Sequence, residues 1–254
     1  PSSKPAVSGS ADVQAAFGGR GITPRGILGS LTGTGRVDLK NTRLAAFGAE
    51  ALEAAVTRAL AVTKDAAGNE TEPAEVKVEP ESFKTMIVEE LAKAPLVIGS
   101  RTVGIDIADG TIRSKPLAFD VTRGKAKATS ILDLNTLRFD SEWSVDTTAR
   151  FPSRPKSAGQ GAPKAADTVG TLQSSASAAA AALQIPSVGW VVTGPLAELP
   201  RLEPRINADA LARELFVRRM ELDVELLERA RKNREEAEQR RQKEQDEANL
   251  RRQQ

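Results

Sequence analysis

The chain has 254 residues with no cysteine and no histidine, and its 36 lysines and arginines nearly balance 34 aspartates and glutamates, for a net charge of +2. The two missing residue types exclude disulfides, thiolate chemistry, every Ser-His or Cys-His catalytic pair and the commonest metal ligand. The basic residues are spread along the chain and matched by acids, so no positive stripe marks a nucleic-acid partner.

Residues 1–22 are rich in serine, glycine and alanine and show little periodicity, which predicts a flexible N-terminal segment, either a frayed entry strand or a linker. Over residues 31–39, apolar residues and glycines alternate with polar residues, as is typical of a half-buried strand. We expect this strand to open a domain that spans residues 23–151.

Two amphipathic helices are predicted next, at 49–62 and 82–94, from apolar residues spaced three and four apart. Ser82 is the expected N-cap of the second helix, and Pro95 is expected to end it. Together the helices form a helical insertion at 49–94.

Four strand-like runs then follow one another over residues 96–147. The turn signals between them are Asp109-Gly110, Arg123-Gly124 and Asn135. In the later runs every second residue is apolar, which predicts an antiparallel meander with one apolar and one polar face.

The apolar face has two interpretations, which the residues alone leave open. It is either closed core, covered by the two helices, or an open groove. The residues that would line such a groove are Leu117, Phe119, Leu132, Leu137, Phe139, Trp143 and Val145.

The remaining chain divides into three parts. A Pro/Ser/Ala-rich linker is predicted at 152–182, a closing strand segment at 183–204 and a charged helical tail at 205–254, with Asn207 able to cap its helix. The start of the tail carries an apolar stripe that fits either the sheet or a partner helix: Leu211, Leu215, Phe216, Leu222 and Leu226. Beyond residue 227 the tail is so polar that we expect a solvated single helix rather than a coiled coil.

No motif predicts catalysis. Ser153 and Lys156 have the spacing of a Ser-x-x-Lys nucleophile pair, but they lie between two prolines in the predicted linker. Asp109 and Gly110 lack the ligand pattern of a calcium loop and predict a hairpin turn. Asp120, Asp133 and Asp140 would pair as acid and base if adjacent strands aligned them, but we expect them simply to occupy the polar face of the sheet. We therefore expect no enzyme, no cofactor and no metal.

Two segments carry a family resemblance. The sequence VGIDIADGTIRSKPLAFDVTRGKAKATSILDLNTLRFDSEW at 103–143 and TGTGRVDLKNTRLAAFG at 32–48 resemble the C-terminal region of AsmA-family bacterial envelope proteins. The segment VVTGPLAELPRLEPRINADALARE at 191–214 looks like the closing strand and terminal helix of that family. The charged segment at 65–81 and the extension after Leu227 have no counterpart in the family pattern.

The residues predict an α+β fold: an antiparallel β-meander sheet, whose apolar face is either closed core or an open groove, with an inserted helical pair and a long C-terminal polar helix. The family resemblance favours the groove. It implies a periplasmic location, attached to the inner membrane through a segment upstream of this fragment, and a part in outer-membrane homeostasis. Related TamB-like proteins are thought to carry phospholipid along an apolar β groove, so phospholipid is the implied partner, with an envelope protein as a second partner through the C-terminal helix. The alternative is a structural or protein-interaction module that assists outer-membrane protein assembly; a hydrolase, for lack of any motif, is third.

Overall fold

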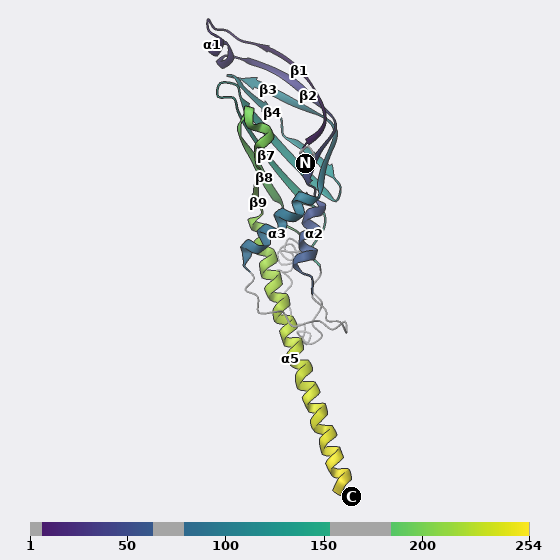
Figure 1. The fold of residues 1–254 in the computed structure, drawn as a ribbon. Coiled ribbons are helices and arrows are strands. Elements are labelled where there is room, and N and C mark those ends of the chain that lie inside the picture. Colours follow the sequence, from purple (N-terminus) through teal and green to yellow (C-terminus); the bar gives the residue numbers. More distant parts are fainter. Residues whose placement is uncertain (1–6, 63–78, 153–183, 254) are drawn as a thin grey trace, which may run out of the picture.

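The computed structural model describes residues 7–62, 79–152 and 184–253. These residues form one antiparallel sheet and a group of helices at one end of it (Figure 1). The predicted α+β class is confirmed. In chain order the elements are β1 (Val7–Gly18), α1 (Pro24–Gly29), β2 (Thr32–Phe47), α2 (Glu50–Ala59), α3 (Pro80–Lys93), β3 (Pro95–Ala108), β4 (Thr111–Ser114), β5 (Leu117–Val121), β6 (Gly124–Asp133), β7 (Arg138–Thr147), β8 (Val188–Pro195), the 3-10 helix η1 (Leu196–Arg201), β9 (Arg205–Asn207) and α5 (Asp209–Gln253).

The sheet is a meander with the order β1-β2-β3-β4-β6-β7-β8-β9, and β5 pairs with β6. Strands β4 and β5 pair with different stretches of the same side of β6, so they are two halves of one strand position. The break between them falls at Pro116, which has no N–H to donate to the ladder. The meander predicted over residues 96–147 is confirmed.

The predicted turns lie where the chain reverses. Asp109 and Gly110 both have positive φ angles, 49° and 72°, as a type I′ turn between β3 and β4 requires. Between β6 and β7, the Asp133 carboxylate accepts the backbone N–H of Asn135 at 2.8 Å and the hydroxyl of Thr136 at 2.8 Å. The Thr136 hydroxyl is the main cause of a lowered pKa for Asp133, with the backbone bond next.

Helix α3 begins earlier than predicted. Ser82 is not its N-cap, because the backbone N–H of Ser82 already bonds the carbonyl of Glu79, the extended residue before Pro80. Proline at the first helical position has its φ preset for the helix and lacks an N–H that would go unpaired there. The predicted end is confirmed, since α3 stops at Lys93, two residues before Pro95.

The helices α2, α3 and α5 seal one end of the sheet, opposite to α1 (Figure 1). Their core consists of side chains that solvent does not reach, among them Leu52, Ile87 and Leu211, together with Leu96 and Val188 from the strands. Ion pairs surround this core: the Lys84 ammonium lies 2.6 Å from Asp209, and Arg58 binds Glu89 and Glu90. The helical pair therefore covers one end of the apolar face and not its whole length.

The N-terminal segment and the region after β7 differ in how far the structure describes them. Residues 7–18 are not part of a flexible segment, because they form strand β1 and pair with β2 along its length. In β1 the apolar Val13 and Phe17 alternate with the polar Asp12 and Gln14. Alanine, serine and glycine at most of the other positions weaken this alternation, so the sequence pattern did not decide between a strand and a linker. The predicted linker lies outside the described residues from 153 to its end at 182, and the closing strand segment contains β8 and η1.

Candidate functional site

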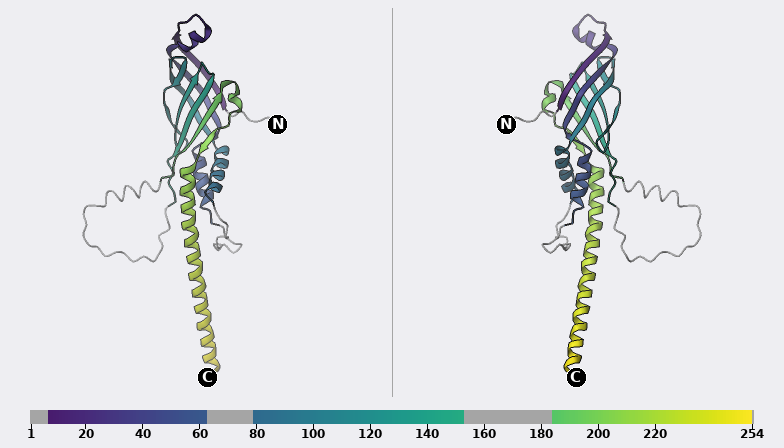
Figure 2. Two further views of the ribbon diagram at one scale, coloured as in Figure 1. Left: turned by 90° about the vertical axis from the view of Figure 1, so that its left-hand side faces the viewer. Right: turned by 90° about the vertical axis from the view of Figure 1, so that its right-hand side faces the viewer.

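The sheet is curved (Figure 2), and its apolar face is the inner one, because Phe47 of β2 contacts Trp190 of β8 across it. Directly opposed residues in antiparallel strands point to the same side, so the register defines rows of side chains across the sheet. The row nearest α1, which we call the rim row, has no polar side chain. Its members are Phe17, Gly33, Ile107, Ile112, Leu132, Phe139 and Gly194.

A row of serines follows, one step nearer to the helices. Ser114, Ser130 and Ser141 lie on β4, β6 and β7. The Ser114 hydroxyl oxygen accepts the backbone N–H of Ser130 at 2.8 Å, and the hydroxyls of Ser130 and Ser141 are 2.7 Å apart. The indole N–H of Trp143 donates to the Ser141 hydroxyl at 2.8 Å. The serines thus bond to one another and to nearby groups, as partly buried polar groups must.

Beyond the serines, aromatic side chains from β2, β7 and β8 close the face. Trp143 and Trp190 stack with their rings 5.8 Å apart, and Phe47 at the end of β2 stacks on Trp190 at 4.3 Å. Since Phe47 and Trp190 come from β2 and β8, which other strands separate in the sheet, this contact spans the concave face. Deeper still, Phe119 and Val145 are buried against the helical core. The inner face is therefore open toward α1 and sealed toward α2, α3 and α5.

A cavity of about 230 Å³ lies at the open half of this face. Val37 of β2 and Phe139 of β7 both line it, which again shows how far the sheet curls. Its other lining residues are Val103, Ile105, Ile112, Ser114, Ser130, Ile131 and Leu132. The volume is below the roughly 300–1,000 Å³ of sites for drug-sized ligands, so it suits a segment of an alkyl chain rather than a whole lipid.

The seven residues predicted for a groove fall into four settings. Leu132 and Phe139 line the 230 Å³ cavity, and Leu117 and Trp143 line a second cavity of about 280 Å³ beside the break at Pro116. Phe119 and Val145 are buried in the sealed end, and Leu137 is exposed in the turn between β6 and β7. Sequence reasoning missed the serine row; the signal was a polar Ser141 in phase with Phe139, Trp143 and Val145.

The predicted partner-helix face is largely occupied by the chain itself. Leu211 and Leu215 are inaccessible to solvent within the core that α5 shares with α2 and α3, and Leu226 is also buried. Phe216 and Leu222 are half-buried. Leu211 and Leu215 therefore stabilise the fold and are not free to contact a partner helix.

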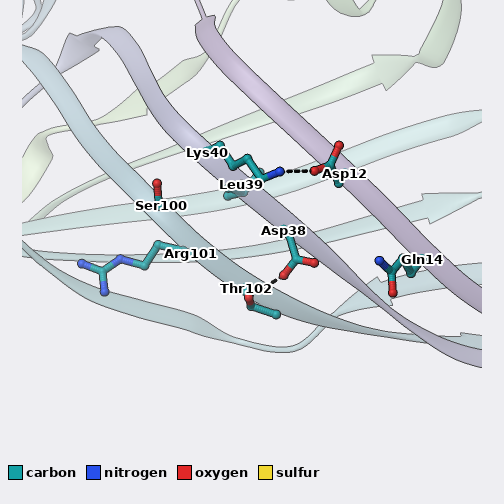
Figure 3. Close-up of a pocket in the computed structure, with 8 residues that line it drawn as sticks. All are labelled: Asp12, Gln14, Asp38, Leu39, Lys40, Ser100, Arg101 and Thr102. Atoms are coloured by element: carbon teal, nitrogen blue, oxygen red, sulfur yellow. Dashed lines mark hydrogen bonds and ion pairs between the residues drawn. The ribbon is translucent and has the colours of Figure 1, made fainter.

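The outer face of the sheet is polar. Figure 3 shows a cavity of about 530 Å³ on it, lined by residues of β1, β2 and β3 that include Asp12, Asp38, Lys40 and Thr102. Lys40 pairs with Asp12, and this hydrogen bond is the main cause of a raised pKa for Lys40. The Thr102 hydroxyl donates to Asp38 at 2.5 Å. These polar groups bind one another across neighbouring strands, so the arrangement is a solvated sheet surface rather than a ligand site.

The three aspartates considered as an acid and base pair lie on the polar side of the sheet. Asp120, Asp133 and Asp140 alternate with inner-face residues and lie on the outer face, as predicted. The pKa of Asp133 is lowered, the opposite of what a general acid needs. Among the described residues no cluster of aspartate and glutamate side chains could hold a metal ion. Ser153 and Lys156 lie outside the described residues.

Comparison with known proteins adds no relative: no family model, no curated protein and no solved structure matches the chain. Across the part of the chain that the structure describes, no helix is long and apolar enough to cross a bilayer. A function for this protein must therefore be argued from the geometry of the inner face and from the sequence pattern.

Proposed function

We propose that the inner face of the sheet binds acyl chains of phospholipid, and that the protein handles lipid or supports its transport in the bacterial envelope. The observation that carries the proposal is the one-ended seal: helices close the face at one end, while the apolar rim row and its cavity remain at the other. The AsmA-like sequence pattern supports the same function and, with it, a periplasmic location and a membrane anchor upstream.

The physical basis is the cost of hydrating alkyl chains. Burial of each methylene group contributes about 0.8 kcal/mol, so binding an acyl chain requires an apolar strip and little polar chemistry. Phe139, Leu132 and Ile112 supply such a strip across three strand positions in one row. The serine row crosses this strip, since Ser114 and Ser130 line the cavity between the rim row and the apolar pair Val37 and Val103.

Lipid analysis tests the proposal directly. Protein purified from cells under native conditions is extracted and its bound lipids are identified by mass spectrometry, and a photoreactive residue at position 139 is then irradiated in the presence of phospholipid. We expect crosslinks from Phe139 and none from the matched control at Val191, which lies on the outer face of β8. A folded protein that carries no lipid and gives equal crosslinking from both positions would refute the proposal.

A second function, a protein-interaction module, is favoured by one observation. Val217, Met220, Val224 and Leu227 are exposed on α5 and repeat at steps of three and four residues, which aligns them on one side of the helix. This stripe differs from the buried one predicted from the sequence. If this function is correct, the double substitution Val217→Glu and Val224→Glu abolishes the protein crosslinks that α5 forms in cells. If the protein handles lipid instead, the same substitutions have no effect on bound lipid, and only changes on the inner face reduce it.

A further inference from the structure

The connection between β1 and β2 carries apolar side chains into solvent at the open end of the sheet. Ile22 is fully exposed, and Phe17 is 63% exposed. Ile27 and Leu28 of α1 are also exposed. Burying side chains of this size in water-free surroundings is strongly favourable, so several of them together in solvent mark a surface that something else covers.

This exposure is built into the local structure. The Thr23 side chain caps α1 by accepting the N–H of Gly26 at 3.1 Å. The Ser30 hydroxyl accepts the N–H of Arg20 at 2.7 Å and donates to the Arg20 carbonyl at 2.6 Å, which closes the loop on itself. The Leu31 carbonyl accepts the N–H of Gly110 at 3.3 Å, so the connection is also fastened to the turn between β3 and β4. Ile22 therefore protrudes from a structured platform.

Neighbouring loops extend the same apolar surface. The backbone N–H of Leu196, at the start of η1, donates to the carbonyl of Leu137 at 2.7 Å, and both leucine side chains are exposed. The side chain of Asn135, in the same turn as Leu137, donates to the carbonyl of Asp109 at 3.3 Å. Three loops and turns thus present aliphatic side chains around the end where the rim row opens.

The charged side chains on the β1–β2 connection are both positive, which favours contact with an anionic surface. Arg20 and Arg25 are exposed, and they are the charged residues of the chain between Asp12 and Arg36. The acidic groups nearby, Asp109, Asp133 and Glu198, lie at the other turns rather than on the connection that bears Ile22, and the Asp133 carboxylate accepts hydrogen bonds from Asn135 and Thr136. Arginine side chains beside protruding aliphatic side chains match the interface of a bilayer, where headgroup phosphates lie directly above the acyl region.

We propose that this end of the sheet, formed by the β1–β2 connection and the turns around Leu137 and Leu196, docks on the surface of a bilayer that contains anionic phospholipid. A bilayer fits better than a protein because the exposed aliphatic side chains come from three loops around one end of the sheet, beside two exposed arginines that match anionic headgroups. The docking surface lies beside the lipid-binding face. The docking proposal rests on the proposed function only for the use of docking, which is that lipid leaving the bilayer would meet the rim row directly.

Vesicle binding tests this surface on the intact chain. The protein is mixed with vesicles of phosphatidylcholine and phosphatidylglycerol, or of phosphatidylcholine alone, and bound protein is separated by flotation. We expect binding to the mixed vesicles that weakens with salt, and a loss of roughly tenfold in partition for each isoleucine replaced in Ile22→Ser and Ile27→Ser. Arg20→Glu with Arg25→Glu is expected to remove the preference for phosphatidylglycerol.

The matched control is Val217→Ser with Val224→Ser, which removes exposed β-branched side chains from α5, away from the open end, and should leave vesicle binding unchanged. Each variant is also loaded with phospholipid from mixed micelles, which bypasses docking. The Ile22 variants should load as the wild type does, so docking and acyl-chain binding can fail separately. Equal flotation of the Ile22 variants and the wild type overturns the docking proposal. The proposal is also overturned if the wild-type protein does not float with either kind of vesicle while a photoreactive residue at position 22 crosslinks to a protein in cells.

Discussion

Leu215 provides the sharpest test of how the sheet is sealed. It lies in the core between α5 and the helices α2 and α3 and has no solvent-exposed surface, whereas Leu227 on the same helix is 49% exposed. Both substitutions to alanine change helix propensity equally, so the difference between them isolates burial. We expect Leu215→Ala to lower the free energy of unfolding by roughly 3 kcal/mol, through lost transfer energy and a residual cavity. Leu227→Ala should change it by less than about 0.5 kcal/mol.

Urea denaturation followed by tryptophan fluorescence measures the difference. The two tryptophans of the chain, Trp143 and Trp190, stack on each other beside the sealed end, so their emission reports on that end. With a denaturant slope of about 2 to 3 kcal/mol per molar, the Leu215→Ala midpoint should fall by roughly 1 M while the Leu227→Ala midpoint stays. Equal midpoints would show that α5 does not seal the sheet, and the one-ended groove would lose its basis.

Three further outcomes are expected. Gly110→Ala should destabilise the protein by more than about 1 kcal/mol, because φ is 72° and the new methyl carbon would meet a backbone oxygen at 2.5 Å, whereas Gly18→Ala, with open space around it, should change stability by less than about 0.5 kcal/mol in the same urea assay. Asp209→Asn should flatten the acid limb of a stability-versus-pH curve: the hydrogen bond from Lys84 lowers the pKa of Asp209, so its stabilisation is present above the unfolded-state pKa and is lost as pH falls through the folded-state value. Trp143→Phe keeps a stacked ring but removes an indole N–H that donates to a serine, and it should cost about 1 kcal/mol on thermal or urea unfolding.

The meander could be predicted because its signals are local. Alternation along β6 and β7 has the two-residue period of a strand, and the residues placed on one face by that period, such as Ala126, Leu132 and Phe139, do share the inner face. The turn at Asp109-Gly110 is encoded in two adjacent residues that tolerate positive φ. Signals of this kind need no knowledge of the rest of the chain.

Other features were missed because their cause is distant in sequence. Strand β1 is held by pairing with β2, and its own small residues carry a weak pattern. The buried stripe of α5 reads equally well as a surface for a partner, and only the docking of Leu211 and Leu215 against other helices decides between the two. The serine row arises because residues from β4, β6 and β7 come into register.

The sequence by itself determined that this protein is a sheet with one apolar face and a polar helical tail, and that histidine and cysteine chemistry is absent. Hydrophobic periodicity and turn residues are properties of short segments, and they act wherever the segment lies. The tertiary structure alone decided that the apolar face is sealed at one end and open at the other. That outcome depends on the curvature of the sheet, which brings Phe47 into contact with Trp190, and on the positions where α2, α3 and α5 pack. Neither can be predicted from a single segment, because both arise from contacts between segments that are distant in the sequence.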